Sequence, residues 1–337
     1  MNNSNKSYKI ITLPGDGIGP EIMICAIKVL ELVAKKYDFN FELSEHLFGG
    51  CSIDKYGIPL TNKTINDCKN SDAILLGAVG GPKWDSLSHD VKPETGLLNI
   101  RKELGLFTNL RPAININNGL NIMILRELTS GIYFGEPRGY KDNKAWNTLS
   151  YTKDEVERIA HVGFKLAQKR NKKLTSVHKS NVLESSQLWK DVVHEISKNY
   201  TNVTVEDMYV DNAAMQLVQN PFQFDVILTQ NLFGDILSDL SATLCGHIGL
   251  LPSASVGEKI GLYEPVHGSA PDIAGKNQAN PVGMILSLGM MFEHSFQMLN
   301  IKNYIFDKTY EYIKELDGED FTINKINLFC DFLNEKW

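Results

Sequence analysis

The stretch that decides the fold is YKIITLPGDGIGPEIMICAIKVLELVA, residues 8–34. Residues 8–13 alternate in hydropathy and are rich in isoleucine, which predicts a β-strand. Residues 14–20 contain three glycines and two prolines and predict a tight loop. The apolar periodicity of residues 22–34 predicts a helix. The chain therefore begins with a strand–loop–helix unit of an α/β protein.

The loop of this unit is close to the dinucleotide fingerprint G-x-G-x-x-G but does not match it. The third glycine would fall at position 20, which is Pro20. Without that glycine, the close packing of helix against strand in a Rossmann turn is not supported. A proline suits the first turn of the following helix instead. The loop therefore favours an α/β unit that is not a Rossmann unit.

Strands and helices alternate along the rest of the chain. The predicted strands are residues 39–44, 73–77, 122–125, 174–178, 203–209 and 225–229, and the predicted helices are residues 153–169, 186–198, 212–219 and 282–299. This alternation predicts an α/β fold with a partly parallel sheet. With 337 residues the chain is long enough for two domains. Because no linker is visible, we expect the domains to exchange chain more than once and to share an extended sheet.

Composition and charge exclude several classes of protein. The net charge of −6 and the lack of a long basic run argue against nucleic-acid binding. No stretch reaches the ~18 unbroken apolar residues of a membrane span, and the polar residues 1–9 lack the core of a secretory signal. Five scattered cysteines without a C-x-x-C pair fit a reducing cytosol better than a disulfide framework or a zinc site. We expect a cytoplasmic protein that binds neither nucleic acid nor membrane.

An acidic pair stands in NLFGDILSD, residues 231–239. Asp235 and Asp239 would lie one turn apart on one face of a helix, where they repel unless a cation lies between them. Hard oxygen ligands of this kind suit Mg²⁺ or Mn²⁺, although such a pair is also typical of a solvated helix face. A third acid, Asp211, follows the end of a predicted strand.

Three arginines have apolar surroundings: Arg101, Arg111 and Arg126. Arg126 follows Ile122-Met123-Ile124-Leu125 at the end of a buried strand, where a guanidinium needs an anionic partner. That partner could be internal, for Arg126 the neighbouring Glu127. Three arginines in one short region favour a substrate with two carboxylates.

Two further candidates follow predicted strands. Tyr133 is flanked by glycines that allow the close approach of a ligand. Lys179, if it lies in a cleft, could have its pKa lowered and serve as a base. The dense small-residue loop from His267 to Lys276 leaves room for a flat ligand, or forms a structural turn, and its Asp272 could accept hydrogen bonds from ribose hydroxyls.

Four motifs together resemble one family. They are LPGDGIGPE from Leu13, RELTSGIYFGEPRG from Arg126, TQNLFGDILSD from Thr229 and EPVHGSAPDIAGK from Glu264. These segments resemble the β-hydroxyacid oxidative decarboxylases, whose members include isocitrate and 3-isopropylmalate dehydrogenases. The resemblance covers nearly the whole chain.

The resemblance implies an architecture and an assembly. The fold would be two α/β domains that share a large mixed sheet, distinct from the Rossmann fold. Residues 1–104 and 250–337 would form the cofactor-binding domain, and residues 105–249 the substrate, metal and dimerisation domain. Members of the family are homodimers with active sites at the subunit interface.

The resemblance also implies roles for the polar candidates. Arg101, Arg111 and Arg126 match the arginines that hold the malate carboxylates. Asp211, Asp235 and Asp239 match the ligands of Mg²⁺ or Mn²⁺; Asp211 would also contact the substrate and, like Lys179, come from the neighbouring subunit. Lys179 would be the base that takes the hydroxyl proton, and Tyr133 the acid that protonates the enolate after CO₂ leaves.

NAD is the implied cofactor. The segment from Gly81 to Glu94 matches the part of the family near the nicotinamide. The residues of the implied adenosine site are Glu264, His267, Gly268, Ser269, Ala270, Asp272, Ile273 and Asn280. An acid at position 272 favours the free ribose 2′-hydroxyl of NAD and repels the 2′-phosphate of NADP.

The implied reaction is oxidative decarboxylation of a 2-hydroxy diacid, with 3-isopropylmalate as the expected substrate in leucine biosynthesis. Leu97 and Leu98 would offer an apolar wall to an isopropyl group and leave a third carboxylate of isocitrate unpaired, although they could equally be core leucines of a helix. The alternatives are the same chemistry on isocitrate, homoisocitrate or tartrate, and a degenerate, inactive paralogue.

Two departures from the family pattern motivate the inactive alternative. The segment between Arg111 and Arg126 is shorter than expected by roughly a dozen residues, so residues 115–119 must form a tight turn. His178 stands where an aspartate usually precedes the lysine, which removes a charge beside the proposed base.

Overall fold

The structure is a computed structural model that describes residues 7–335, so residues 1–6 of the polar start of the chain lie outside the described residues. The chain forms two compact units. Unit 1 consists of Met1–Leu106 and Ile248–Trp337, and unit 2 of Phe107–His247. Unit 1 is therefore assembled from both ends of the chain.

Within the described residues, unit 1 contains a mixed sheet with the strand order β2-β1-β3-β12-β11. The strands are β1 (Ser7–Gly15), β2 (Asn40–Glu45), β3 (Ala73–Ala78), β11 (Pro252–Val256) and β12 (Gly261–Pro265). The first four in this order are parallel, and β11 runs antiparallel to β12.

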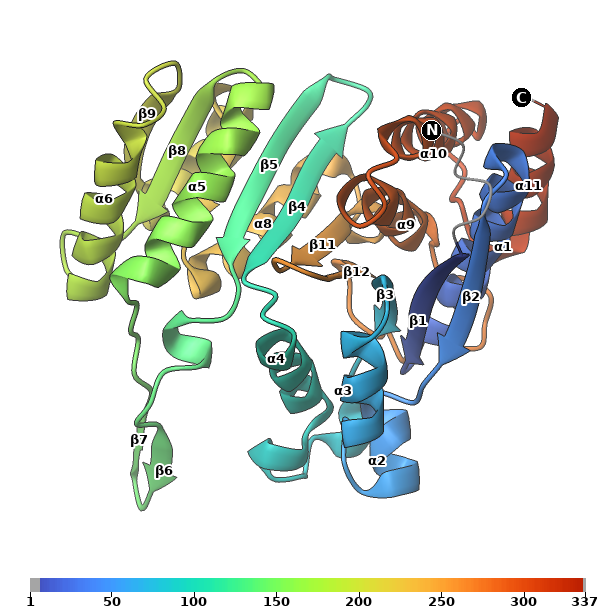
Figure 1. Ribbon diagram of the computed structural model, residues 1–337, viewed down its shortest axis with the longest axis horizontal. Helices are drawn as coiled ribbons and strands as arrows, with labels where there is room; N and C mark the ends of the chain where they lie inside the picture. Colours follow the sequence, from blue (N-terminus) through green and yellow to red (C-terminus); the bar gives the residue numbers. More distant parts are fainter. Residues whose placement is uncertain (1–6, 336–337) are drawn as a thin grey trace. The chain divides into compact units, whose positions relative to one another are not determined.

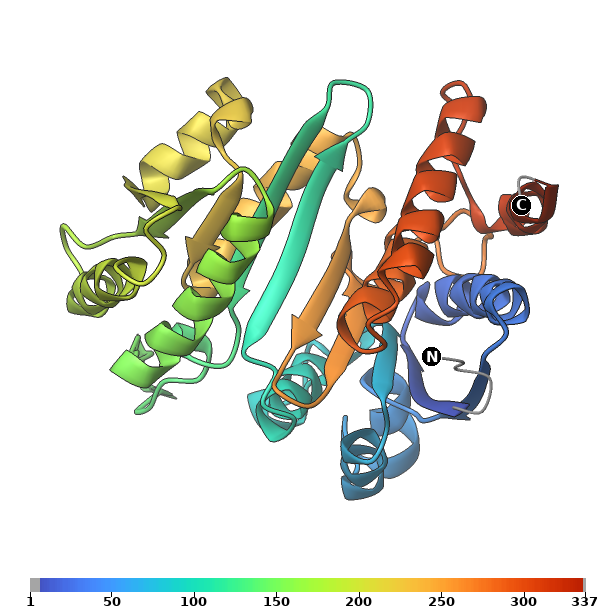
Figure 2. The ribbon, with the colours of Figure 1, turned by 45° about the horizontal axis from the view of Figure 1, so that its top comes forward.

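Helices cover both faces of this sheet (Figures 1 and 2). The α-helices of unit 1 are α1 (Gly19–Tyr37), α2 (Gly50–Tyr56), α3 (Asn62–Lys69), α4 (Pro93–Glu103), α9 (Val282–His294), α10 (Leu299–Glu315) and α11 (Ile326–Glu335). Short 3₁₀ turns are η1 (Pro82–Trp84), η2 (His89–Val91), η5 (Ile248–Leu250) and η6 (Ile323–Lys325). Helices α1 and α9 pack on one face. Cys68 of α3 and Ile100 of α4 join Ile11, Leu13 and Ile74 in a core cluster on the other.

The strand–loop–helix unit predicted from residues 8–34 is confirmed by β1 and α1. The single helix predicted over residues 282–299 is wrong, because α9 ends at His294 and α10 begins at Leu299. Gln297 takes a left-handed conformation with φ 57° between the two helices. Phe296, between the two helices, is also buried. The apolar pattern of the sequence therefore continues through the turn and does not indicate where the first helix ends.

The other five strands of the ten-stranded mixed sheet belong to unit 2 and follow the order β4-β5-β10-β8-β9. The strands are β4 (Thr108–Asn115), β5 (Leu120–Glu127), β8 (Lys173–His178), β9 (Thr204–Tyr209) and β10 (Val226–Thr229). Strands β4 and β5 form an antiparallel hairpin, and β5, β10, β8 and β9 are parallel. The tight turn predicted at residues 115–119 is confirmed, since Asn115 pairs with Leu120 and the Gly119 amide donates to the Asn115 carbonyl at 3.0 Å.

Four α-helices flank the strands of unit 2. They are α5 (Lys153–Lys169), α6 (Glu184–Ser197), α7 (Val210–Gln219) and α8 (Asn231–Cys245), with 3₁₀ turns η3 (Gly131–Tyr133) and η4 (Pro221–Gln223). Figure 1 shows α5 in front of the strands and α8 behind them. Helix α5 spans the residues predicted because Thr152 and Glu155 form a capping box at its start.

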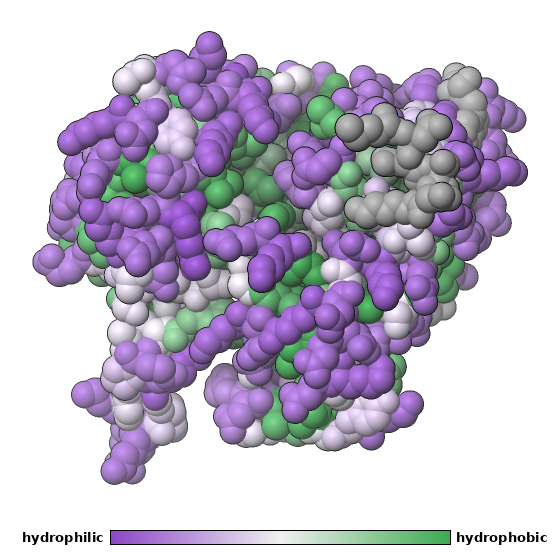
Figure 3. All heavy atoms as spheres, viewed as in Figure 1, coloured by the Kyte–Doolittle hydropathy of each residue, from purple (hydrophilic) through white to green (hydrophobic). Residues whose placement is uncertain are grey.

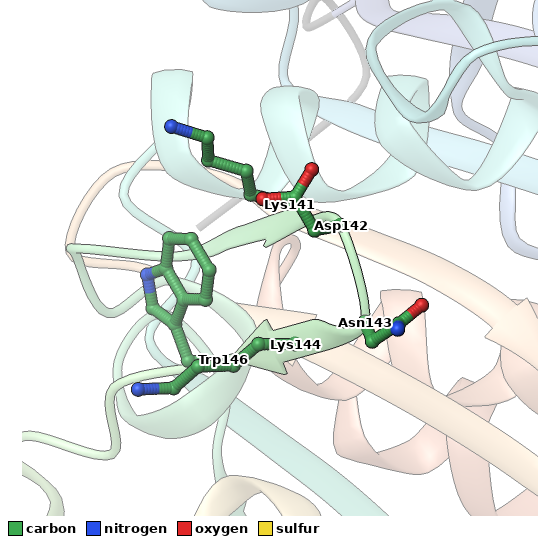
Figure 4. Close-up of a pocket in the computed structure, with 5 residues that line it drawn as sticks. All are labelled: Lys141, Asp142, Asn143, Lys144 and Trp146. Carbon is green, nitrogen blue, oxygen red and sulfur yellow. The ribbon is translucent and has the colours of Figure 1, made fainter.

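A two-stranded arm projects from unit 2 between η3 and α5. Its strands, β6 (Gly139–Lys141) and β7 (Lys144–Trp146), pair with each other. Its tip is hydrophilic in Figure 3. Figure 4 shows a hollow lined by residues of the arm alone: Lys141, Asp142, Asn143, Lys144 and Trp146.

The predicted α/β class with a mixed sheet is confirmed, and β1 leads into α1 without a Rossmann glycine turn. The five cysteines are all free thiols. Over residues 7–335, the helices are too short or too polar to cross a membrane.

Candidate active site

The carboxyl ends of β5, β8, β9 and β10 lie at one end of the unit 2 sheet because these strands are parallel. Arg126 lies near the end of β5, Lys179 directly follows β8, and Asp211 is in the first turn of α7 after β9. Ligands of open α/β sheets bind beyond this end of the strands. Predicted site residues from distant parts of the sequence are therefore brought to one end of the sheet.

Two arginines converge on one carboxylate of α8. Arg126 Nη1 donates to Asp235 Oδ1. Arg111 Nη1 lies 3.3 Å from the same oxygen and 3.3 Å from Asp239 Oδ1. Arg126 is only 2% exposed and Arg111 9%, so both cations are largely removed from water. The shortened hairpin has thus not displaced Arg111 from Arg126, because the residues are missing at the opposite end of β4 and β5.

The sequence suggested Glu127 as an internal partner of Arg126, and this suggestion is wrong. Glu127 accepts instead from Arg158 of α5 at 3.1 Å, and from the backbone amide of Ser130 at 2.9 Å. Adjacent residues of a strand point to opposite faces of the sheet, so Glu127 and Arg126 face different helices. Burial raises the pKa of the Glu127 carboxyl, while its hydrogen bonds and Arg158 oppose that rise.

Two buried asparagines fix the orientation of the arginines, and the sequence had not singled them out. Asn109 Oδ1 accepts from Arg111 Nε at 2.9 Å, and Asn231 Oδ1 accepts from Arg126 Nε at 2.9 Å. Asn231 Nδ2 also donates to the carbonyl of Ser130 at 2.9 Å. Asn231 begins α8 two residues after the buried strand β10 and lies one turn before Asp235, and this position is the signal that could have found it.

Tyr133 ends the 3₁₀ turn η3 and points at the same carboxylate. Its hydroxyl donates to Asp235 Oδ2 at 2.9 Å. The turn requires glycine at its start, since Gly131 has φ 77° and a Cβ there would lie 2.4 Å from the hydroxyl oxygen of Tyr151. Burial, followed by the charge of Asp235, raises the pKa of Tyr133 to about 12. The phenol therefore keeps its proton at neutral pH.

Asp235 and Asp239 lie on one face of α8, as their spacing predicts. Burial raises the pKa of Asp239, Arg111 opposes that rise and the charge of Asp235 adds to it. A divalent cation would relieve this repulsion, and carboxylate oxygens are the ligands that Mg²⁺ and Mn²⁺ prefer. Between residues 7 and 335, no cluster of three or more His, Cys, Asp or Glu side chains is close enough to hold a metal. One chain thus offers two carboxylates, which fit part of a hard-cation site.

The third predicted metal ligand lies elsewhere in unit 2, with the predicted base. Lys179 Nζ donates to Asp211 Oδ1 at 2.5 Å. This bond, together with a backbone hydrogen bond, lowers the pKa of Asp211, whose side chain is 68% exposed. The structure therefore brings Lys179 and Asp211 together, and within the described residues Asp211 does not join Asp235 and Asp239 in a cluster that could hold a metal.

His178, at the end of β8, is buried and contacts a polar cluster that reaches the surface at Asp207 and His194. Its Nε2 lies 3.2 Å from Asp207 Oδ1, and His194 Nε2 lies 2.6 Å from Asp207 Oδ2. Burial of Asp207 raises its pKa, but the hydrogen bonds and charges of the two histidines outweigh this effect and lower the pKa to about 2. Asp207 thus links β9 to the strand end that carries Lys179.

In unit 1, Arg101 pairs with Glu264. The Arg101 Nη2 to Glu264 Oε1 distance is 2.7 Å and both side chains are nearly buried. A predicted substrate residue on α4 is thus fixed to a predicted cofactor residue at the end of β12. Leu97, also on α4, packs against the core cluster of unit 1, and Leu98 is half-buried. Leu97 therefore contacts the core, as the alternative interpretation of the sequence predicts, and is only partly buried.

The remaining predicted cofactor residues lie in two loops of unit 1. Gly81 precedes η1, and Glu94 lies in the first turn of α4. The loop between β12 and α9 holds His267, Gly268, Ser269, Ala270, Asp272, Ile273 and Asn280. Gly268 and Asp272 are exposed, whereas Ser269 is buried. Asn280 Oδ1 accepts the Val282 amide at 2.9 Å and so caps the start of α9.

The fold and the polar residues described above are consistent with one family of enzymes. A profile of the isocitrate/isopropylmalate dehydrogenase family matches residues 9–322. The chain belongs to this family. The crystal structure of isocitrate dehydrogenase from Methylococcus capsulatus superposes with a TM-score of 0.87 at 33% identity, over 97% of this chain and 99% of that chain.

Curated relatives narrow the similarity further. A 3-isopropylmalate dehydrogenase of Chlorobium chlorochromatii is 57% identical over 308 residues, which is 88% of each chain. One from Pseudomonas fluorescens is 55% identical over 311 residues, 87% of this chain and 86% of the relative. The sequence identity to these two 3-isopropylmalate dehydrogenases, 57% and 55%, is thus much higher than the 33% identity to the isocitrate dehydrogenase.

Proposed function

We propose that the protein catalyses the NAD-dependent oxidative decarboxylation of 3-isopropylmalate to 4-methyl-2-oxopentanoate and CO₂, a step of leucine biosynthesis. The observation that carries the proposal is the convergence of Arg111, Arg126 and Tyr133 on Asp235, in a chain 57% identical to a 3-isopropylmalate dehydrogenase. Free cysteines fit a cytoplasmic location.

The arginines bind and orient the substrate. Arg111 and Arg126 are buried and held at Nε by asparagines, so their guanidinium planes are preorganised for carboxylates. Arg101, held by Glu264 in unit 1, would contribute a third guanidinium. The two carboxylates of a diacid would offer anionic partners to Arg111 and Arg126, which are largely removed from water.

Two proton-transfer groups then have separate tasks. Lys179 takes the proton of the 2-hydroxyl as the hydride leaves, and its pairing with Asp211 fixes its position. Tyr133, which keeps its proton at neutral pH, donates that proton to carbon after CO₂ has left.

Asp235 and Asp239, with Asp211 of a second copy of the chain, would hold Mg²⁺ or Mn²⁺. When bound, the metal supplies electrophilic polarisation of the hydroxyl and carbonyl oxygens. NAD⁺ supplies the hydride acceptor, held by the segment from Gly81 to Glu94 and by the loop that carries Asp272 and Ile273. The exposed Asp272 would accept from ribose hydroxyls and repel a 2′-phosphate.

Leu97 and Leu98 give the substrate choice. Both are only partly buried on α4, so they can present apolar surface to an isopropyl group. A carboxylate in that position would be left unpaired. This favours 3-isopropylmalate over isocitrate.

A homodimer with shared sites is supported by the pairing of Lys179 with Asp211, which within the described residues forms no metal-binding cluster with Asp235 and Asp239. Apolar side chains that are exposed on α7 and α8, namely Met215, Val218 and Ile236, offer a surface for a second copy. The arm offers another, because a two-stranded sheet is marginally stable alone.

The test is NADH formation, followed by absorbance, with purified protein, Mn²⁺ or Mg²⁺, and either 3-isopropylmalate or isocitrate. We expect metal-dependent turnover of 3-isopropylmalate with NAD⁺, and at most feeble turnover of isocitrate or with NADP⁺. Turnover of isocitrate instead would remove the argument from Leu97 and Leu98 but keep the mechanism. A folded dimer that turns over no 2-hydroxy diacid would support the inactive paralogue.

A further inference from the structure

The glycine loop that fails the dinucleotide fingerprint contains a buried carboxylate outside the chemistry described so far. Asp16 is 4% exposed. Its Oδ2 accepts from the backbone amides of Gly50 and Gly80, each at 2.8 Å, and its Oδ1 accepts from the amide of Cys51 at 2.8 Å. Three amides from two other segments of unit 1 thus meet on one side chain.

One of these segments leads directly into the predicted nicotinamide residues. Gly80 follows β3 and precedes Gly81, where that part of the cofactor site begins. A Cβ at Gly80 would lie 2.5 Å from Glu94 Oε1, so the Gly80 backbone lies between the carboxylates of Asp16 and Glu94. Its φ of 97° is one that glycine adopts without strain.

The same loop supports the predicted adenosine segment. The amide of Ile18 donates to the carbonyl of Ser269 at 2.9 Å. A Cβ at Gly17 would lie 2.0 Å from that carbonyl oxygen, so the two backbones are in direct contact. Glu21, in the first turn of α1, accepts from the amide of Gly275. Residues 15–21 are therefore a common base for both cofactor segments.

We infer that Asp16 is a positioning residue for the dinucleotide: it fixes the start of the nicotinamide segment to the loop on which the adenosine segment rests. This inference rests on the proposed use of NAD. Asp16 itself need not touch the cofactor. Its effect is to set the spacing of the two segments, and so it should change the affinity for NAD(H) and leave the binding of the diacid and metal unchanged.

The test is Asp16→Asn, which has nearly the same shape but one acceptor oxygen. The side-chain NH₂ group of the variant faces at least one of the three backbone N–H donors and cannot accept a hydrogen bond from it. Because hydrogen bonds to a charged group are the stronger ones, we expect the NADH dissociation constant, measured by fluorescence, to rise about tenfold. The affinity for 3-isopropylmalate with Mn²⁺, measured by calorimetry without NAD, should stay within about twofold of wild type.

Two further variants sharpen the result. Asp72→Asn is the matched control, because Asp72 also accepts a backbone amide in unit 1, that of Lys9 at 2.8 Å, but lies outside both cofactor segments. It should leave NADH binding unchanged. Glu21, on the surface of α1, contacts only the adenosine segment, through the amide of Gly275. Glu21→Ala should therefore weaken NADH binding by about threefold. This variant can be measured even if Asp16→Asn does not fold.

The outcomes separate this inference from the proposed function. Wild-type protein that binds NADH, with a folded Asp16→Asn variant that binds it equally well, would overturn the inference alone. A variant that loses NADH, diacid and thermal stability together would show that Asp16 acts only on folding. Wild-type protein that binds no NADH would remove the proposed cofactor and the inference with it.

Discussion

At the scale of single residues, Asp235 accepts hydrogen bonds from Arg126 and Tyr133 and forms an ion pair with Arg111 at the same time. A substrate carboxylate would compete with Asp235 for the two arginines and the phenol, and a metal ion would compete with them for Asp235. In the chain without ligands, the Asp235 carboxylate therefore occupies the position of a substrate carboxylate. The proton of Tyr133 is the part of this arrangement that can be tested most directly.

Tyr133→Phe removes that proton without a change of shape. General acids contribute about a hundredfold or more to rate, so we expect kcat to fall by about that factor while the affinity for 3-isopropylmalate changes little. NADH should still form in a single turnover, followed by slow release of the decarboxylated product, which rapid-quench analysis would detect. The control is Tyr140→Phe on the exposed arm. A variant with full kcat would exclude Tyr133 as the acid.

Asn231 supports Arg126 through its Nε and is itself held by the carbonyl of Ser130. Asn231→Ala removes an acceptor from a buried guanidinium and leaves the Ser130 carbonyl without its donor. We expect a loss of about 2 kcal/mol in the free energy of unfolding and about tenfold weaker binding of 3-isopropylmalate, measured by urea titration and calorimetry. Asn202→Ala, at an exposed asparagine of the same unit, is the control. Unchanged affinity for the diacid would show that Arg126 needs no such support.

At the scale of elements, Asp207 ties β9 to β8 and α6 through His178 and His194. Its pKa of about 2 lies below the usual 3.8, so the ionised carboxylate stabilises the fold above pH 3.8, and that contribution is lost as the pH falls through about 2. Lys190 of α6 is a further cation near Asp207 Oδ2, at 3.7 Å.

Asp207→Asn should therefore lower the free energy of unfolding by on the order of 1 kcal/mol near about pH 5, after allowance for solvent screening. The difference from wild type should shrink as the pH falls toward about 2. Urea titrations over this range measure it. Asp191→Asn, at an exposed position of α6, should show no such trend. A difference that is constant with pH would mean that the hydrogen-bond geometry, and not the charge, is what Asp207 contributes.

Elements with strong local signals were predictable from the sequence. The helix predicted over residues 153–169 matches α5, whose start is fixed by the capping box of Thr152 and Glu155, and the apolar period of residues 22–34 predicted α1. Short helices such as α2 and α3 were not predicted, because their burial depends on packing against the sheet and not on a repeating pattern. The break between α9 and α10 was missed because apolar residues continue through it.

For the candidate site, the sequence offered single charged and aromatic residues as candidates, but neither their pairings nor the supporting asparagines Asn109 and Asn231. Asp235 and Asp239 share a face because a helix has a fixed period, which the sequence contains. The pairing of Arg126 with Asp235 depends on how α8 packs on β5, and the pairing of Arg101 with Glu264 on how α4 lies beside β12. Such contacts between distant segments have no local signal. For the same reason Asp16 appeared only as a loop residue.

At the scale of the whole molecule, the proposed homodimer can be tested through its shared sites, because within the described residues Asp211, the partner of Lys179, forms no metal-binding cluster with Asp235 and Asp239. Chains that carry Tyr133→Phe and chains that carry Lys179→Met should each be nearly inactive alone. Co-expressed chains form about half mixed dimers, and in each mixed dimer one site receives both native residues.

The mixture should therefore recover about a quarter of wild-type activity if Tyr133 and Lys179 of a site come from different chains. If one chain supplies both residues, each site of a mixed dimer lacks one of them and no activity returns. Two affinity tags on the chains isolate the mixed dimer, whose activity per dimer should then be about half that of wild type. Ile236→Asp, on the exposed face of α8, should abolish this recovery by preventing association, because a buried charge in the interface would be unpaired. Sedimentation of the same variant would show whether the recovery was lost through dissociation.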